Sequence, residues 1–269
     1  MLHVSRFKFQ RQTRLGKYTV ISTNHPYPKL RPIDIQSTVQ RGQPALLLRD
    51  PLQLSGNYAV LPQGLGPALA MMDGTLDLAD LAAAVMAVYG MVYPDGLLQQ
   101  LVDVLDENFM LENARAAEAY DRALAAYRAA PFRPPSMAGQ SYPADPAGLR
   151  RLFDSYLAQL NGASRAAPPA VGRGVFSPHI DYHRGGPVYA AVWQQAAAMA
   201  QAADLVILLG TDHYSQGDRL TLTRQSYATP YGVLPTDVAL VDALAASIGT
   251  EAALRGELRH RSAHSLELV

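Results

Sequence analysis

The spacing of apolar and polar residues between positions 174 and 214 predicts a βαβ unit. Residues 174–177 form a short apolar run that ends at Pro178, because the residue before a proline is driven out of helical conformation. An alanine-rich segment, 188–203, suits a helix packed on a sheet. Residues 205–210 (LVILLG) are apolar at almost every position, as expected of a strand buried on both faces of a parallel sheet. The predicted fold class is therefore α/β, with a parallel sheet in this part of the chain.

A different pattern covers residues 30–130. Two strand-like runs, 45–49 and 57–61, are separated by turn residues and predict a β-hairpin. Leucines and alanines then recur every three or four positions, which predicts helices over 66–72, 77–89 and 94–105. Three helices and a hairpin indicate a small helical domain with a winged-helix-like outline.

A connecting helix is predicted over 112–129, because alanines alternate with charges along its length. Pro131, Pro134 and Pro135 follow it, and we place the domain boundary there. The second domain, 133–269, has further predicted elements besides the βαβ unit: helices over 146–160 and 237–246 and short strands over 220–223, 227–229 and 233–234.

The leader, residues 1–29, contains every lysine of the chain, Lys8, Lys17 and Lys29, and the chain has no acidic residue before Asp34. A one-signed charge with few apolar residues predicts a disordered basic tail.

Composition narrows the functional classes. The 269 residues contain 23 Lys plus Arg, 23 Asp plus Glu and no cysteine, which excludes disulfides and thiolate chemistry within them. No Lys or Arg lies between Arg49 and Arg115, whereas nine acidic residues do, so we expect no nucleic-acid binding by the first domain. No apolar run is long enough to cross a membrane, and we expect a cytoplasmic protein without a membrane partner.

Two histidines are the first candidates for chemistry. His179 and His213 would each follow the carboxyl end of a strand of the βαβ unit, the edge where open α/β sheets bind ligands. Two neutral imidazoles at one such edge predict a site for a transition metal, and two hydrogen-bonded loop histidines are the alternative. His183 is a candidate catalytic or substrate-contacting residue, or a plain surface histidine. Asp181 and Asp212 are candidates for orienting the imidazoles, or are solvated loop residues.

Several motifs resemble, in order and spacing, those of the Memo family, also called AmmeMemoRadiSam system protein B. They are SPHIDYHRGGPVYA from Ser177, VILLGTDH from Val206, ATPYGVLPTD from Ala228 and HSLE from His264, with PPSMAGQSYP upstream. The resemblance covers 133–269 and implies the fold of class III extradiol dioxygenases, with iron at a strand-end site. It also places His264 in the same pocket as a catalytic acid or base, and a structural histidine is the alternative.

The resemblance implies a domain about twice as long, so we expect a truncated Memo-like domain whose third metal ligand is absent from this chain. The expected cofactor is Fe(II), with Zn or Cu as alternatives. Residues 68–85 and 102–111 of the first domain resemble PqqD-type peptide-recognition domains.

Two functions remain open from the sequence. One is a metal-dependent oxygenase or redox enzyme acting on a small molecule or a modified peptide. The other is a non-enzymatic protein that binds a peptide or protein, with radical-SAM and AMMECR-type proteins as the partners implied by the family's system name.

Overall fold

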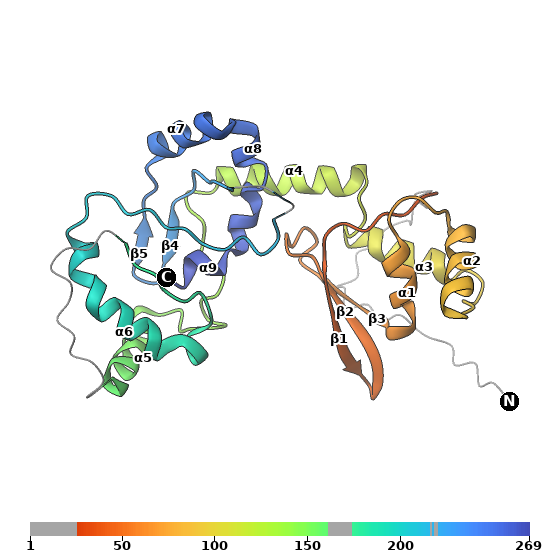
Figure 1. Ribbon diagram of the computed structural model, residues 1–269, viewed down its shortest axis with the longest axis horizontal. Helices are drawn as coiled ribbons and strands as arrows, with labels where there is room; N and C mark the ends of the chain where they lie inside the picture. The colour runs from red at the N-terminus through yellow and green to blue at the C-terminus, as the bar shows by residue number, and fades with distance from the viewer. Residues whose placement is uncertain (1–25, 161–173, 216, 218–219) are drawn as a thin grey trace.

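The computed structural model describes residues 26–160, 174–215, 217 and 220–269. The chain forms two bodies joined along one long helix (Figure 1). Most of the predicted basic leader lies outside the described residues. Its last residues are described: the backbone carbonyl of Lys29 accepts a hydrogen bond from the Glu112 N–H at 2.8 Å, and its ammonium group pairs with the Glu112 carboxylate at 2.9 Å.

The N-terminal body contains a three-stranded antiparallel sheet in the order β1-β2-β3. The predicted hairpin is confirmed as β2 (Gln43–Arg49) and β3 (Tyr58–Pro62), paired antiparallel from Ala45 opposite Pro62 to Arg49 opposite Tyr58. The pattern missed β1 (Asp34–Gln40). This edge strand is largely exposed and polar, so it lacks the apolar alternation that identifies a half-buried strand.

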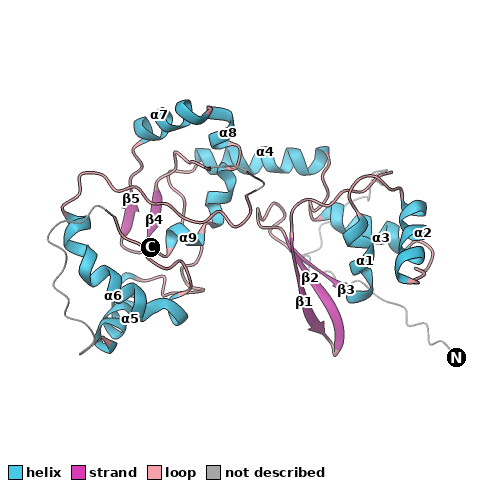
Figure 2. Cartoon of the chain, in the orientation of Figure 1, coloured by secondary structure: helices cyan, strands magenta, loops and turns pink. Residues whose placement is uncertain are grey.

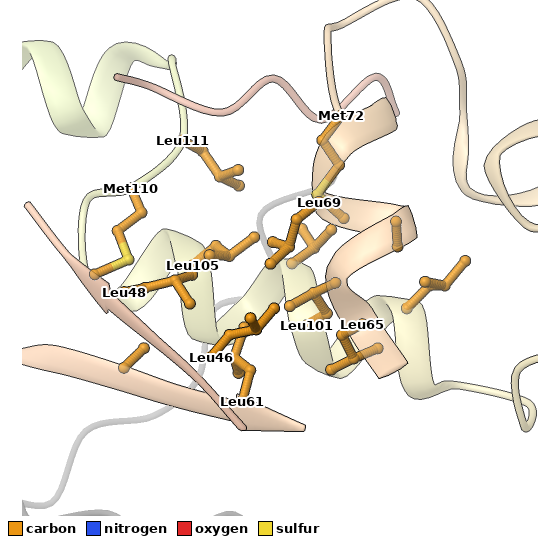
Figure 3. Close-up of a cluster of buried hydrophobic side chains, with 14 of the residues drawn as sticks. Leu46, Leu48, Leu61, Leu65, Leu69, Met72, Leu101, Leu105, Met110 and Leu111 are labelled. Atoms are coloured by element: carbon orange, nitrogen blue, oxygen red, sulfur yellow. The ribbon is translucent and has the colours of Figure 1, made fainter. Parts of the chain in front are cut away.

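Helices cover one face of this sheet (Figure 3). They are η1 (Gln63–Leu65), α1 (Gly66–Met71), α2 (Leu78–Tyr89) and α3 (Leu97–Glu107). Asp77 begins α2 because its carboxylate accepts hydrogen bonds from two first-turn N–H groups, and Gly90 ends it at a positive φ of 65°. Leu48, Leu61, Leu101 and Leu105 are almost fully buried between sheet and helices. The three predicted helices are thus present, and the winged-helix assignment stays a prediction.

Helix α4 (Ala114–Ala129) connects the two bodies. Its N-terminus is fixed to the first body, because Asn113 caps it and Arg115 pairs with the Asp106 carboxylate at 2.6 Å. Its C-terminal turn belongs to the second body, where Tyr127 is buried and Arg128 donates to Glu257 at 2.6 Å.

The second body is a mixture of helices and short strands (Figure 2). Its elements are α5 (Pro146–Gln159), α6 (Tyr182–Gln201), β4 (Tyr227–Thr229), β5 (Gly232–Leu234), α7 (Val238–Ile248), α8 (Thr250–Leu254), η2 (Glu257–Ser262) and α9 (His264–Glu267). In the part of the chain that is described, no helix is long and apolar enough to cross a bilayer.

The predicted parallel sheet is not formed by the described residues. The sheet of the second body pairs β4 with β5 antiparallel, and 174–177, 205–210 and 220–223 belong to no strand. Residues 205–210 are exposed rather than buried; Ile207 is 64% and Leu209 82% accessible. β-Branched residues favour an extended backbone. A strand also needs a neighbouring strand with which to exchange backbone hydrogen bonds, and the described residues place none beside this run.

The predicted helix after Pro187 begins earlier than expected. Helix α6 starts at Tyr182 because the Asp181 carboxylate caps it, accepting from the Arg184 N–H at 3.1 Å, and Pro187 is accommodated inside the helix. Gly186 allows α6 to lie directly on α5: a Cβ atom there would lie 2.4 Å from the ring of Tyr156. The Gly-Gly-Pro sequence is therefore a packing feature and not a break.

A buried ion pair joins the two ends of the second body. The side chains of Arg133 and Glu267 are 0% and 1% exposed, and the guanidinium donates to the carboxylate. The same carboxylate accepts from the Ser136 N–H, the Met137 N–H and the Tyr142 hydroxyl at 2.9, 2.7 and 2.6 Å. Burial alone would raise the pKa of Glu267, but these donors and the Arg133 charge lower it below its ordinary value. Glu267 is therefore an ionised structural carboxylate.

Candidate functional site

Three histidines from three segments converge in the second body. His179 precedes α6, His213 follows the apolar run 205–210, and His264 is the first residue of α9. The ring centroids are 5.3 Å apart for His179 and His213, 4.9 Å for His213 and His264, and 6.2 Å for His179 and His264. The fold thus brings together histidines that are 34 and 51 residues apart in the sequence.

The segment that carries His213 is fixed against α9 by a close approach of the backbone. A Cβ atom on Gly210 would lie 2.6 Å from the Ser265 Oγ and 2.8 Å from the Leu266 side chain, so any larger residue would have to displace these side chains. The Ser265 hydroxyl donates to the Thr211 carbonyl at 2.8 Å. Because Ser265 directly follows His264, the same contact places the two rings side by side.

Asp212 gives the segment its second anchor. Its carboxylate accepts from the Arg259 Nε at 2.7 Å, from the Thr221 hydroxyl at 3.1 Å and from the Tyr214 N–H at 3.2 Å. Arg259 is held in turn by Thr221 at 2.9 Å. Asp212 was a candidate for orienting an imidazole directly. Its contacts instead fix the backbone on either side of His213, so it positions this histidine indirectly.

Two other predicted residues lie differently from the expectation. Asp181 caps α6 and pairs with Arg184 at 2.5 Å, so its carboxylate is committed to the helix start. His183 lies in the first turn of α6 and is exposed, and among the described residues it makes no ring contact with the other three histidines. The structure therefore brings together three of the four predicted site residues.

The electrostatics of the cluster favour a neutral imidazole at His264. Burial, followed by the neighbouring rings of His213 and His179, lowers the pKa of His264 below its ordinary value. A neutral ring keeps a nitrogen lone pair, which is the form that binds a metal or accepts a proton.

The geometry of the three histidines is not that of a formed metal site. Among the described residues, no set of three or more His, Cys, Asp or Glu side chains is arranged to hold an ion. The rings of His213 and His264 are stacked with only 8° between their planes, whereas ligand nitrogens at about 2.0–2.1 Å from one ion must point to a common centre. Side-chain rotation would be needed, and the partial exposure of the three rings leaves room for it. The imidazole nitrogens are suitable metal ligands, but in the observed ring orientations they do not point to a common centre.

Sequence reasoning did not single out Gly210, Arg259 or Ser265. A glycine at the end of an apolar run was the available signal, since such a glycine often marks a close backbone approach. Arg259 offered none, because its partner Asp212 is 47 residues away.

The chain belongs to the Memo family: the family model for Memo-like proteins matches residues 133–269. This region contains all three histidines of the cluster and the Arg133–Glu267 pair.

Relatives with the name MEMO1 family protein occur in bacteria and archaea. One from Aquifex aeolicus is 28% identical over 240 residues, 89% of this chain and 60% of the relative. One from Methanopyrus kandleri is 30% identical over 142 residues, and one from Methanosarcina acetivorans is 31% identical over 137 residues; each match covers 51% of this chain. The chain spans 60% of the first relative and about half of the other two. No solved structure matches the chain.

Proposed function

We propose that this Memo-family chain binds a divalent transition-metal ion through His179 and His213, with His264 as the third imidazole. The observation that carries the proposal is the convergence of three rings, 4.9 to 6.2 Å apart, from three separate segments. A lowered pKa of His264 supports it, because a metal ligand must be deprotonated.

The carboxylates around the cluster decide which ligand set is available. Asp212 is bound to Arg259, and Glu267 is buried against Arg133. An ion at the cluster would therefore meet imidazoles before carboxylates, which suits Zn(II), Cu(II) or Fe(II) rather than Mg(II) or Ca(II). A two-histidine, one-carboxylate iron site of the ring-cleaving type would need a carboxylate from outside this cluster.

An ion held by three protein ligands keeps open positions, and there it would act as a Lewis acid or a redox centre towards a small molecule or modified peptide. The chain's own residues have separate tasks. His179 and His213 bind and orient the ion. His264 either completes the ligand set or, left uncoordinated, accepts a proton as a neutral imidazole. Asp212 and Ser265 hold the backbone beside His213 and His264.

Metal binding to the wild-type chain and to matched variants tests this proposal. Co(II) titration followed by visible absorption, and Zn(II) titration by calorimetry, should give one ion per chain. His179→Ala and His213→Ala should each weaken binding by at least about tenfold, the equivalent of about 1.4 kcal/mol.

His183→Ala is the control, since His183 is exposed and lies four residues from His179. It should bind like the wild type. Equal affinity in the His179, His213 and His183 variants would rule out the three-histidine site.

Exposed apolar segments beside the cluster favour a second candidate, a protein- or peptide-binding function. Phe176 is 98% accessible, and residues 205–209 are 44 to 82% accessible over five consecutive apolar positions. Surfaces of this kind usually contact another polypeptide. The radical-SAM and AMMECR-type proteins expected from the family resemblance are the partners to test. Co-purification that is lost on Leu209→Lys, with metal affinity retained, would support this candidate.

A further inference from the structure

A cavity of about 420 Å³ lies where the two bodies of the protein meet. One side is formed by Pro32, Leu52 and the N-terminal half of α4, and the other by Tyr214, Arg255 and Arg259. Its volume is within the range of small-molecule sites, about 300–1,000 Å³, which occur preferentially at domain junctions.

Hydrogen bonds across the junction fix the walls. The Tyr120 hydroxyl donates to the Arg255 carbonyl at 2.7 Å, and the Tyr214 hydroxyl donates to the Asp34 carboxylate at 2.8 Å. The Arg261 guanidinium donates to the Leu52 carbonyl. A cavity bounded by such contacts exists before a ligand arrives, which lowers the cost of binding.

The apolar part of the lining suits a compact, flat group. Pro32, Pro51, Leu52, Ala116 and Ala117 provide hydrocarbon surface, and Tyr120 adds an aromatic ring. A ligand with an aromatic or short aliphatic body would displace water from this surface.

The charged part of the lining contains three guanidinium groups, those of Arg31, Arg255 and Arg259, and the carboxylates of Glu112 and Asp121. Most of these charges pair with residues outside the lining: Glu112 pairs with a lysine at 2.9 Å, and Arg31 and Arg259 pair with aspartates. Arg255 is therefore the lining cation to which an anion has most access.

The three arginines differ in how closely they are already paired with carboxylates. Arg31 and Arg259 are bound to Asp50 and Asp212, which lie outside the lining, and both donate to further oxygens, so their charges are already compensated. Arg255 faces Glu251 at 3.8 Å, beyond hydrogen-bond distance, and both side chains are largely exposed. Arg255 is therefore the group best able to reorient towards a ligand.

We propose that this junction cavity is a binding site for a small organic anion with an apolar body, such as an aromatic carboxylate, with Arg255 as the principal contact to the carboxylate. The site is separate from the histidine cluster and does not require a metal. It adjoins the segment that carries His213, because Arg259 and Tyr214 line the cavity and also contact Asp212.

Binding of 3-phenylpropionate to the full chain tests the proposal. Saturation-transfer NMR and calorimetry are performed in the presence of a chelator, so that failure of the metal proposal has no bearing on the result. The anion should bind more tightly than the neutral alcohol 3-phenylpropanol, and the amine 3-phenylpropylamine should bind most weakly.

Variants distinguish the cavity from other surfaces. Arg255→Gln should weaken 3-phenylpropionate binding about tenfold through loss of a charge-assisted hydrogen bond, and Asp121→Asn should strengthen it. Ala117→Phe should block the cavity, whereas Ala125→Phe, on an exposed position of the same helix outside the lining, should bind like the wild type.

No detectable binding of 3-phenylpropionate at millimolar concentration would overturn the proposal. So would binding that survives both Ala117→Phe and Arg255→Gln, or a preference for the amine. Helix α4 is exposed at positions 117 and 125, so both phenylalanine variants should fold, and equal circular dichroism spectra would verify this.

Discussion

Replacing Glu267 by glutamine should destabilise the second body strongly, although the side chain barely changes in size. Arg133 is fully buried, and the substitution removes the charge that compensates its guanidinium. The amide also cannot accept at both positions, so it loses either the Ser136 or the Met137 and Tyr142 donors. Removing one partner of a buried pair costs about 3–5 kcal/mol. The carbonyl of His260 would still accept a hydrogen bond from Arg133 in the variant. We therefore expect a loss of unfolding free energy at the lower end of this range, about 3 kcal/mol.

Urea unfolding followed by the fluorescence of Trp193 measures this loss, since the single tryptophan lies in α6 of the same body. Glu251→Gln is the matched control: its carboxylate is 92% exposed, and the change should stay within about 0.5 kcal/mol.

The acid limb of the stability curve gives an independent check. The pKa of Glu267 is lowered in the folded state, so its contribution is present above its ordinary value of 4.5 and is lost as the pH falls through the folded value. Glu267→Gln should lack this component. A midpoint of Glu267→Gln equal to that of Glu251→Gln would refute the reasoning, because it would mean that the Arg133 charge does not depend on Glu267.

Three further changes have expected outcomes. Gly210→Ala should cost about 1–3 kcal/mol and weaken Zn(II) binding, because its Cβ atom would displace the Ser265 and Leu266 side chains beside His264. Gly174→Ala, with nothing within 4 Å, should leave Zn(II) affinity and the urea midpoint unchanged. His260→Asn should flatten the pH dependence of unfolding below 6.5, the ordinary pKa of histidine: burial lowers the pKa of His260, so its contribution is present above 6.5 and is lost as the pH falls towards the folded value. A wild-type slope in the variant would contradict this. Leu209→Lys should reduce the binding of a hydrophobic dye, because this side chain is 82% exposed, and unchanged dye fluorescence would count against an accessible apolar run.

Local signals in the sequence located most helices of the molecule. Asp77, Asn113, Asp145 and Asp237 cap α2, α4, α5 and α7 close to the predicted starts, because a cap depends on a few adjacent residues. The prediction of a buried strand at 205–210 was wrong for the opposite reason. The composition of this run favours a strand, but its burial depends on partners distant in sequence, and a single sequence does not display those.

The candidate site divides in the same way. His179 and His213 were found from residue type and position at the ends of apolar runs, and His264 from the resemblance to the Memo family; the structure gathers all three. Their supports were not found, because the Arg259–Asp212 and Ser265–Thr211 contacts join residues 47 and 54 positions apart. Their metal-binding role remains a prediction.

Helix α4 also has a consequence for how the molecule can be divided. The Memo match begins at residue 133, yet the Gln225 side-chain amide donates to the carbonyls of Tyr127, Arg128 and Ala130 at 2.6 to 3.1 Å. Glu257, 1% exposed, takes its ion pair from Arg128. A protein shortened to the matched residues would lose the three carbonyl acceptors of the Gln225 amide, at a cost of about 1–3 kcal/mol. Glu257 would lose its ion pair and keep the hydrogen bond from the Thr223 hydroxyl at 3.0 Å. The region matched by the family model therefore begins after contacts that the second body uses, and the last turn of α4 should be kept with the Memo region in any recombination of its domains.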